Sequence, residues 1–236
     1  MPQSEVLSEV LSEVLAGVVG GYLVVTLCES VFHRILQHAS PRLRRVYRRL
    51  GGLGREVLRA WHAHHVVHHY LTFRRDHVTQ FVSAEERARL DAKLRAKGHG
   101  AAITRAYGAR IGPHVWDFLY YVTPTLPIFA AVCWAGGTAF TAGAMIPFVL
   151  WPALAQWVHP CLHMPYAEIA ARAPWPVQHF ARSWYFRRLA IHHWVHHRYE
   201  QCNYNLLMGG DWLLGQHRRA SARDLVEMRR IGLWTP

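Results

Sequence analysis

Cysteine is scarce in this 236-residue chain, and basic residues are missing from long stretches of it. The four cysteines are scattered and form no CxxC pair, which excludes a disulfide scaffold, a cysteine-rich zinc site and an iron–sulfur cluster. The N-terminal segment carries Glu5, Glu9 and Glu13 but no cation. It therefore lacks the basic region that opens a secretory signal, and we expect no cleaved leader.

Lysine and arginine are absent from residues 1–33 and 115–171, although the chain has 27 of them and a formal net charge of +12. These stretches contain apolar runs near the roughly 20 residues that cross a bilayer as a helix. Prolines inside such runs are tolerated in packed membrane helices. The pattern predicts a turn at Gly136-Gly137 and three membrane spans, over residues 14–32, 115–134 and 138–158.

The distribution of cations also predicts an orientation, because basic loops stay on the cytoplasmic side of a membrane. We expect the N-terminus outside, and residues 33–114 and 159–236 in the cytoplasm. The predicted fold is one all-α domain over residues 1–236, an integral membrane helical bundle of about three spans with a cytoplasmic helical cap. The alternative is a soluble helical protein whose apolar runs form its core, which would not sort its cations into two blocks.

An arginine-rich segment follows the first predicted span. Its apolar residues recur at helical spacing while arginines fill the other side: Leu43, Val46, Tyr47 and Leu50 against Arg42, Arg44, Arg45, Arg48 and Arg49. This pattern predicts a helix over Arg42–Arg49 that lies among anionic lipid headgroups. A nucleic-acid partner is disfavoured because the adjoining spans place these arginines next to lipid.

Histidine is abundant, with 18 residues, and four motifs stand out. They are HRILQH (His33, His38), HVVHH (His65, His68, His69), HPCLH (His159, His163) and HWVHH (His193, His196, His197). On an α-helix at about 100° per residue, the HX2HH spacing places three imidazoles within an arc of about 100°. The HX3H pair also shares a face, whereas the HX4H pair needs a bend in the chain.

Ten imidazoles on one side of a membrane repel one another when protonated and lose hydration when buried without partners. Metal coordination explains them better than packing does. Ten nitrogens exceed what one ion uses, whereas two ions with about five each leave positions open for water or dioxygen. Structural zinc prefers a closed set of four ligands, so the set favours two irons as the cofactor, with O2 as co-substrate.

The order HX4H, HX2HH, HX3H, HX2HH resembles the signature of the fatty acid hydroxylase / sterol desaturase superfamily of integral-membrane diiron enzymes. The sequences His69-Tyr70-Leu71 and Asn203 to Gly215 resemble their neighbours in that family, and the resemblance covers about Ala16 to Arg219. It implies that the ten motif histidines are the metal ligands. No catalytic residue beyond the metal centre is predicted.

The resemblance implies a monooxygenase that hydroxylates an unactivated C–H bond of a lipid-like substrate. A lipid or sterol-type desaturase and a carotenoid ring hydroxylase remain open alternatives on the same site, and the HX4H and HX3H spacings favour hydroxylation. The family commonly has four spans where three are predicted here. A second copy of the chain, in a homo-oligomer, would complete the wall of the substrate tunnel.

Some groups beside the motifs are predicted to orient the ligands or to replace one of them. A carboxylate that accepts the far N–H of a ligating imidazole fixes its tautomer and raises its basicity. These candidates are His62, His64, His192, Glu29, Glu200 and Asp211.

Two further expectations concern partners and a rival class. The chain has no haem domain, no glycine-rich nucleotide loop and no cysteine cluster, so reduction of the metals requires an external electron donor. The excess of cations favours an acidic ferredoxin or a cytochrome of the b5 kind. The rival class is a metal transporter or sensor, which needs polar ligands near the bilayer midplane; the predicted spans have no histidine in their interiors.

Overall fold

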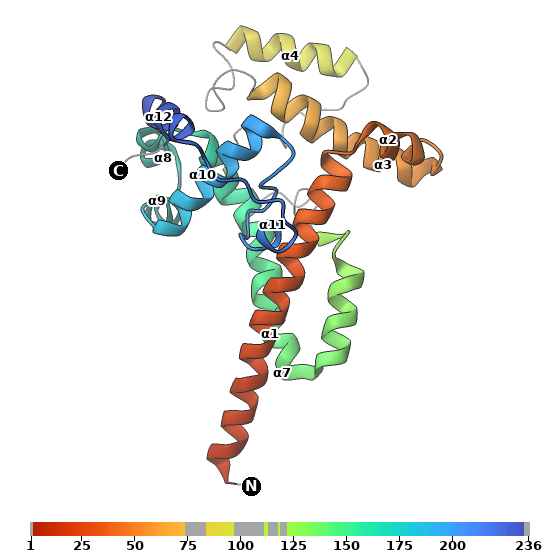
Figure 1. The fold of residues 1–236 in the computed structure, drawn as a ribbon, viewed down its shortest axis with the longest axis vertical. Coiled ribbons are helices and arrows are strands. Elements are labelled where there is room, and N and C mark those ends of the chain that lie inside the picture. Colours follow the sequence, from red (N-terminus) through yellow and green to blue (C-terminus); the bar gives the residue numbers. More distant parts are fainter. Residues whose placement is uncertain (1, 74–83, 97–110, 113–117, 119–121, 234–236) are drawn as a thin grey trace.

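The computed structural model describes residues 2–73, 84–96, 111–112, 118 and 122–233. All regular secondary structure within these residues is helical, which confirms the all-α class for this part of the chain. The long helices α1 (Gln3–Phe32) and α7 (Leu126–Ala153) form a narrow stem, and the shorter helices gather in a cap at one end of it (Figure 1).

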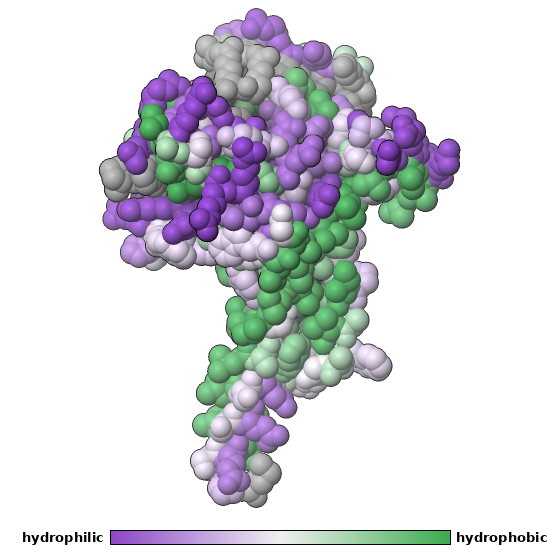
Figure 2. All heavy atoms as spheres, in the orientation of Figure 1, coloured by the Kyte–Doolittle hydropathy of each residue, from purple (hydrophilic) through white to green (hydrophobic). Residues whose placement is uncertain are grey.

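On the face shown in Figure 2, the part of the stem next to the cap is apolar, whereas its N-terminal end is hydrophilic. Leu15, Val19 and Leu23 of α1 are exposed at 57%, 60% and 44%, which suits a lipid environment better than water. Two segments of the described residues are long and apolar enough to cross a membrane, Gln3–Gln37 and Leu126–His163. These features indicate membrane association.

Helix α7 is two helical pieces joined at Gly137, whose φ of 78° and ψ of −174° are not helical. The chain reverses direction there (Figure 1), at the turn that the sequence predicts. The predicted third span, 138–158, therefore follows the turn as one helical piece. The predicted second span, 115–134, lies partly outside the described residues, so the three-span bundle stays a prediction.

Glycines bring the two stem helices into close contact. A Cβ atom on Gly17 would lie 2.0 Å from the Phe140 carbonyl oxygen, and one on Gly143 would lie 2.0 Å from that of Val14. Only glycine leaves room for backbones this close, as is common where membrane helices cross. The contact fixes the relative positions of the ends of α1 and α7 that lie in the cap.

The arginine-rich segment forms the predicted helix, which ends at Tyr47 and is the first arm of a helical hairpin. Helix α2 (Pro41–Tyr47) starts at the N-cap Ser40 and stops before a turn at Arg48, and α3 (Gly51–Trp61) follows it. The two helices pack closely, because Gly54 lies so near the Tyr47 carbonyl that a Cβ atom there would sit 1.7 Å from its oxygen.

Helix α10 (Trp184–Tyr199) packs against the cap helices α9 (Trp175–Ala181) and α12 (Ala222–Arg230). It starts at the N-cap Ser183 and ends at Glu200 in a left-handed conformation. Leu189 and Val195 of this helix are fully buried. The remaining α-helices are α4 (Ala84–Ala96), α8 (Tyr166–Arg172) and α11 (Gly210–Leu213). This packing places one face of α10 against the ends of both stem helices.

Candidate metal centre

The first histidine motif lies in a π-helical turn, η1 (His33–Gln37), at the cap end of α1. In a π-helix the backbone bond joins residues five apart, and the His38 N–H donates to the His33 carbonyl at 3.0 Å. The two rings are stacked with their centroids 5.2 Å apart. The bend that the HX4H spacing requires is thus a single π turn, a feature that is frequent at functional sites.

The second motif also lies in a π-helix, η2 (His62–Thr72), and the predicted α-helical arc for it is wrong. The wider turn changes which imidazoles meet. His64 stacks on His68 with ring centroids 5.0 Å apart, and the Nε2 atoms of His64 and His69 lie 3.1 Å apart. The π geometry therefore brings His64 into the centre.

The third motif follows another π-helical turn, η3 (Leu154–Val158), and forms the 3-10 helix η4 (His159–His163). The ring centroids of His159 and His163 are 5.2 Å apart. The fourth motif is α-helical as predicted, because it lies within α10, and His193, His196 and His197 are all buried.

Nine histidines form two groups, each with one ring nitrogen per residue within 4.8 Å of all the others in its group. We call them the five-histidine group (His68, His159, His163, His193, His197) and the four-histidine group (His33, His38, His64, His196). Eight of the nine come from the ten motif histidines, and the ninth is His64.

The nitrogens converge within each group. In the five-histidine group, the His193 Nε2 atom lies 2.9 Å from that of His163 and 3.2 Å from that of His159. In the four-histidine group, the Nε2 atoms of His33 and His64 are 2.9 Å apart. Imidazoles bound to one metal at about 2.1 Å have neighbouring nitrogens roughly 3.0–3.4 Å apart, so the spacing is close to that of a coordination sphere.

The four-histidine group also contains buried nitrogens without a hydrogen-bond partner. Among the described residues, these include the Nε2 atoms of His38 and His196. A buried polar atom without a partner is costly. A metal ion bound between these nitrogens would satisfy them, so the residues present fit a metal. Imidazole donors suit iron, zinc, copper and nickel.

The protonation state suits metal binding as well, since only a neutral imidazole offers a lone pair. Burial, with the charge of neighbouring imidazoles as a smaller cause, lowers the pKa of most cap histidines in the centre well below the usual range: His64, His68, His69, His193 and His197. Burial lowers the pKa of His196 to about 4. These rings are neutral at pH 7.

We expect the metal-free cap to lose stability as the pH falls from about 6.5 toward 4. In this window the unfolded chain binds protons on these histidines while the folded protein does not, so each contributes about 1.4 kcal/mol of destabilisation per pH unit. Near-ultraviolet circular dichroism of the metal-free protein during an acid titration measures it. Unchanged cap stability between pH 7 and 5 would contradict the expectation.

Two motif histidines lie outside both groups. His69 lies between them, because its ring stacks on that of His197 at 4.1 Å while its Nε2 atom contacts His64. His65 is half-buried, and its Nδ1 atom lies 3.3 Å from the Nδ1 atom of His38.

The other candidate groups have partners of their own. His192 contacts Asp211, with 3.1 Å between Nε2 and Oδ2, so these two predicted groups pair with each other. Glu200 accepts a hydrogen bond from the Tyr70 hydroxyl, which raises the pKa of Tyr70 to about 12. His62 lies next to Trp61, with ring centroids 6.3 Å apart. Glu29 accepts hydrogen bonds from two backbone N–H groups, which are described below.

Backbone carbonyls orient two of these histidines, and no sequence pattern indicates which carbonyls these are. The His33 Nδ1–H donates to the Tyr204 carbonyl at 2.7 Å, and the His196 Nδ1–H donates to the Cys202 carbonyl at 2.9 Å. A neutral ring protonated on Nδ1 has its lone pair on Nε2. Both carbonyls therefore direct an Nε2 lone pair into the four-histidine group.

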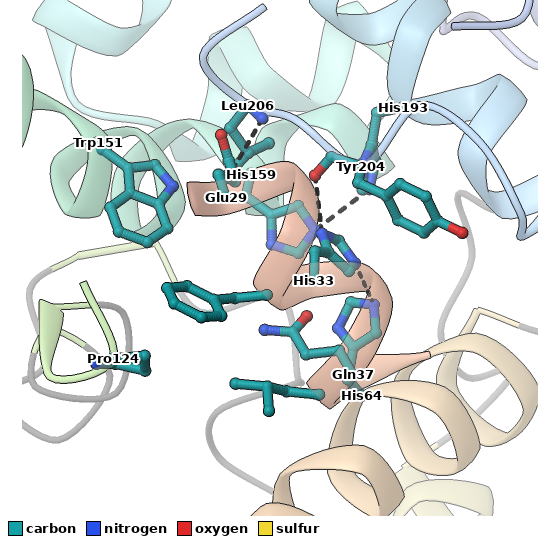
Figure 3. Close-up of a pocket in the computed structure, with 12 residues that line it drawn as sticks. Glu29, His33, Gln37, His64, Pro124, Trp151, His159, His193, Tyr204 and Leu206 are labelled. Carbon is teal, nitrogen blue, oxygen red and sulfur yellow. Dashed lines mark hydrogen bonds between the residues drawn. The ribbon is translucent and has the colours of Figure 1, made fainter. Parts of the chain in front are cut away.

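A pocket connects the centre with the stem (Figure 3). Histidines from both groups line it, His33 and His64 from one and His159 and His193 from the other. Its other walls are mainly apolar: Phe32, Leu36, Pro124, Trp151 and Leu206, with Glu29, Gln37 and Tyr204 as the polar residues. A ligand in this pocket would contact histidines of both groups.

Comparisons with protein-family models, with curated proteins and with solved structures find no match to this chain. Its function is therefore inferred from the geometry of the site.

Proposed function

We propose that this protein is a membrane-bound diiron oxygenase that hydroxylates an unactivated C–H bond of a lipid-like substrate. The observation that carries the proposal is the pocket, which is lined both by apolar residues of the two stem helices and by histidines of both groups. A purely structural metal needs no such access.

The two histidine groups would hold the metals, and two bound irons supply the activation of dioxygen and the abstraction of hydrogen. The chain's own residues have three tasks. The buried imidazoles offer neutral nitrogen donors, the carbonyls of Cys202 and Tyr204 hold two of them in the ligating tautomer, and the apolar walls exclude water from a reactive centre.

Substitution of His196 tests the proposal. Its Nε2 atom is buried without a partner, and its ring lies 4.8 Å from both His33 and His38. We expect the purified protein to hold about two irons per chain, and His196→Ala to lose metal and product together, because the four-histidine group is left with three ligands. Elemental analysis and lipid mass spectrometry measure this. A fully active variant would contradict it.

The same experiment separates hydroxylation from desaturation. Hydroxylation adds one oxygen atom to the substrate, whereas desaturation removes two hydrogen atoms. A lipid desaturase or a carotenoid ring hydroxylase is the second candidate, since the pocket is compatible with either chemistry. A product that has only lost hydrogen would select the desaturase. Metal flux into vesicles without an oxygen requirement would select a transporter.

The proposal includes an orientation and two partners. The N-terminus would lie outside, with the cap and the C-terminus in the cytoplasm, where an acidic ferredoxin or a cytochrome b5-like protein supplies electrons. The α2–α3 hairpin would lie on anionic lipid. Its exposed apolar residues are Val46, Leu50 and Leu53, and it carries seven arginines. In Figure 2, the side of the α2–α3 hairpin nearer the stem is apolar, and its outer side is hydrophilic.

Reconstituted turnover at low and high ionic strength distinguishes the two uses of the basic surface. With a subsaturating acidic donor, we expect the rate to fall as salt rises, because salt screens the attraction between the partners. A flat rate would assign the basic surface to lipid headgroups alone.

A further inference from the structure

One stripe of polar residues runs along the otherwise apolar helix α1. Tyr22, Thr26 and the adjacent pair Glu29 and Ser30 lie about one helical turn apart, and His33 continues the stripe into η1. Polar side chains within a membrane segment are costly unless they are paired. All five bond to residues 202–211, which we call the strap.

The far half of the strap is held by Thr26. Its hydroxyl accepts a hydrogen bond from the Gly210 N–H at 2.9 Å and donates to the Leu207 carbonyl. Its carbonyl accepts from the Asn205 side-chain amide at 2.7 Å. Ser30 adds contacts to Asn205 and to Asp211, at 3.0 Å and 2.5 Å. The strap is therefore fixed along one face of α1.

Glu29 holds the middle of the strap. Its side chain is buried, its Oε1 atom accepts from the Leu206 N–H at 2.9 Å, and its Oε2 atom accepts from the Leu207 N–H at 3.0 Å (Figure 3 shows Glu29 beside Leu206). Both oxygens of one carboxylate thus bind consecutive backbone donors. A carboxylate has two acceptor oxygens and can accept from both N–H groups. A glutamine amide has one acceptor oxygen, and its NH2 group would face the second N–H, where no hydrogen bond can form.

The near half of the strap holds two metal-site histidines. The Cys202 carbonyl accepts from His196, and the Tyr204 carbonyl accepts from His33. Both histidines belong to the four-histidine group. Only one residue separates Tyr204 from Leu206. A shift of the strap backbone at Leu206, where Glu29 binds it, would therefore also move the Tyr204 carbonyl that accepts from His33.

We propose that Glu29 is a positioning residue for one of the two metals, the one bound by the four-histidine group. It fixes the strap, and the strap's carbonyls set the tautomer and direction of His33 and His196. The proposal rests on the metal centre proposed above. It assigns Glu29 a role through the backbone, without contact between its carboxylate and a ligand.

Stepwise zinc binding to the metal-free full-length protein tests this role. Competition with a chelator of known affinity gives both dissociation constants. We expect Glu29→Gln to weaken one of two sites about 10–100-fold, as outer-shell changes typically do, and to leave the other unchanged. Glu29→Asp keeps both acceptors on a shorter stem and should give a smaller loss, so a result remains available if Glu29→Gln does not fold.

Thr26→Val is the matched control. It removes the hydroxyl contacts of the far half of the strap with little change in shape, so it should lower the thermal unfolding midpoint and leave both zinc affinities unchanged. Equal weakening of both sites in Glu29→Gln, two unchanged sites in both Glu29 variants, or the same selective loss in Thr26→Val would overturn the positioning role. A wild-type protein that binds no zinc would instead overturn the metal centre itself.

Discussion

His64→Ala is expected to lose one metal, while His65→Ala keeps both. The resemblance from the sequence points to His65, but this residue is only half-buried and lies outside both groups. The ring of His64 is 3% exposed and places its Nε2 atom 2.9 Å from that of His33. Loss of this nitrogen leaves the four-histidine group with three ligands, so the metal content should fall from about two ions per chain to about one.

Elemental analysis of both purified variants, with circular dichroism as a check on folding, measures this difference. The two residues are adjacent on η2, which makes His65→Ala a close control for local disruption of the helix. The reverse result, a metal lost from His65→Ala and kept in His64→Ala, would support the ligand set that the sequence motif predicts, with His65 and without His64.

Removal of the metals is expected to lower the thermal unfolding midpoint by about 8–16 °C for each site. A ligand at 1,000 times its dissociation constant stabilises the folded state by about 4 kcal/mol, and one kcal/mol shifts the midpoint of a chain this long by about 2–4 °C. Without metal, the buried Nε2 atoms of His38 and His196 lack a partner. Differential scanning calorimetry in detergent, with and without a strong chelator, measures the shift.

The double variant His193→Ala/His196→Ala removes one ligand from each group and serves as the control. Its unfolding midpoint should respond little to the chelator, since little metal is bound to be withdrawn. An unchanged midpoint in the wild-type protein would show that the imidazoles are satisfied by one another and would exclude a tightly bound metal.

The sequence by itself determined the helical class, the apolar segments and the grouping of histidines. These features depend on composition and spacing: residues 1–33 and 138–158 have no cation, and the HWVHH spacing matches the 3.6-residue period of α10. Local periodicity is enough for such predictions, because it is a property of neighbouring residues alone.

Only the tertiary structure decided which imidazoles meet. The π turns at His33 and His64 depart from the period that the sequence pattern assumes, and extended π geometry is rare without support from surrounding contacts. The choice between His64 and His65 follows from that geometry. The carbonyls of Cys202 and Tyr204 carry no sequence signature, since every residue has a carbonyl, and they reach His196 and His33 only because the strap packs against α1.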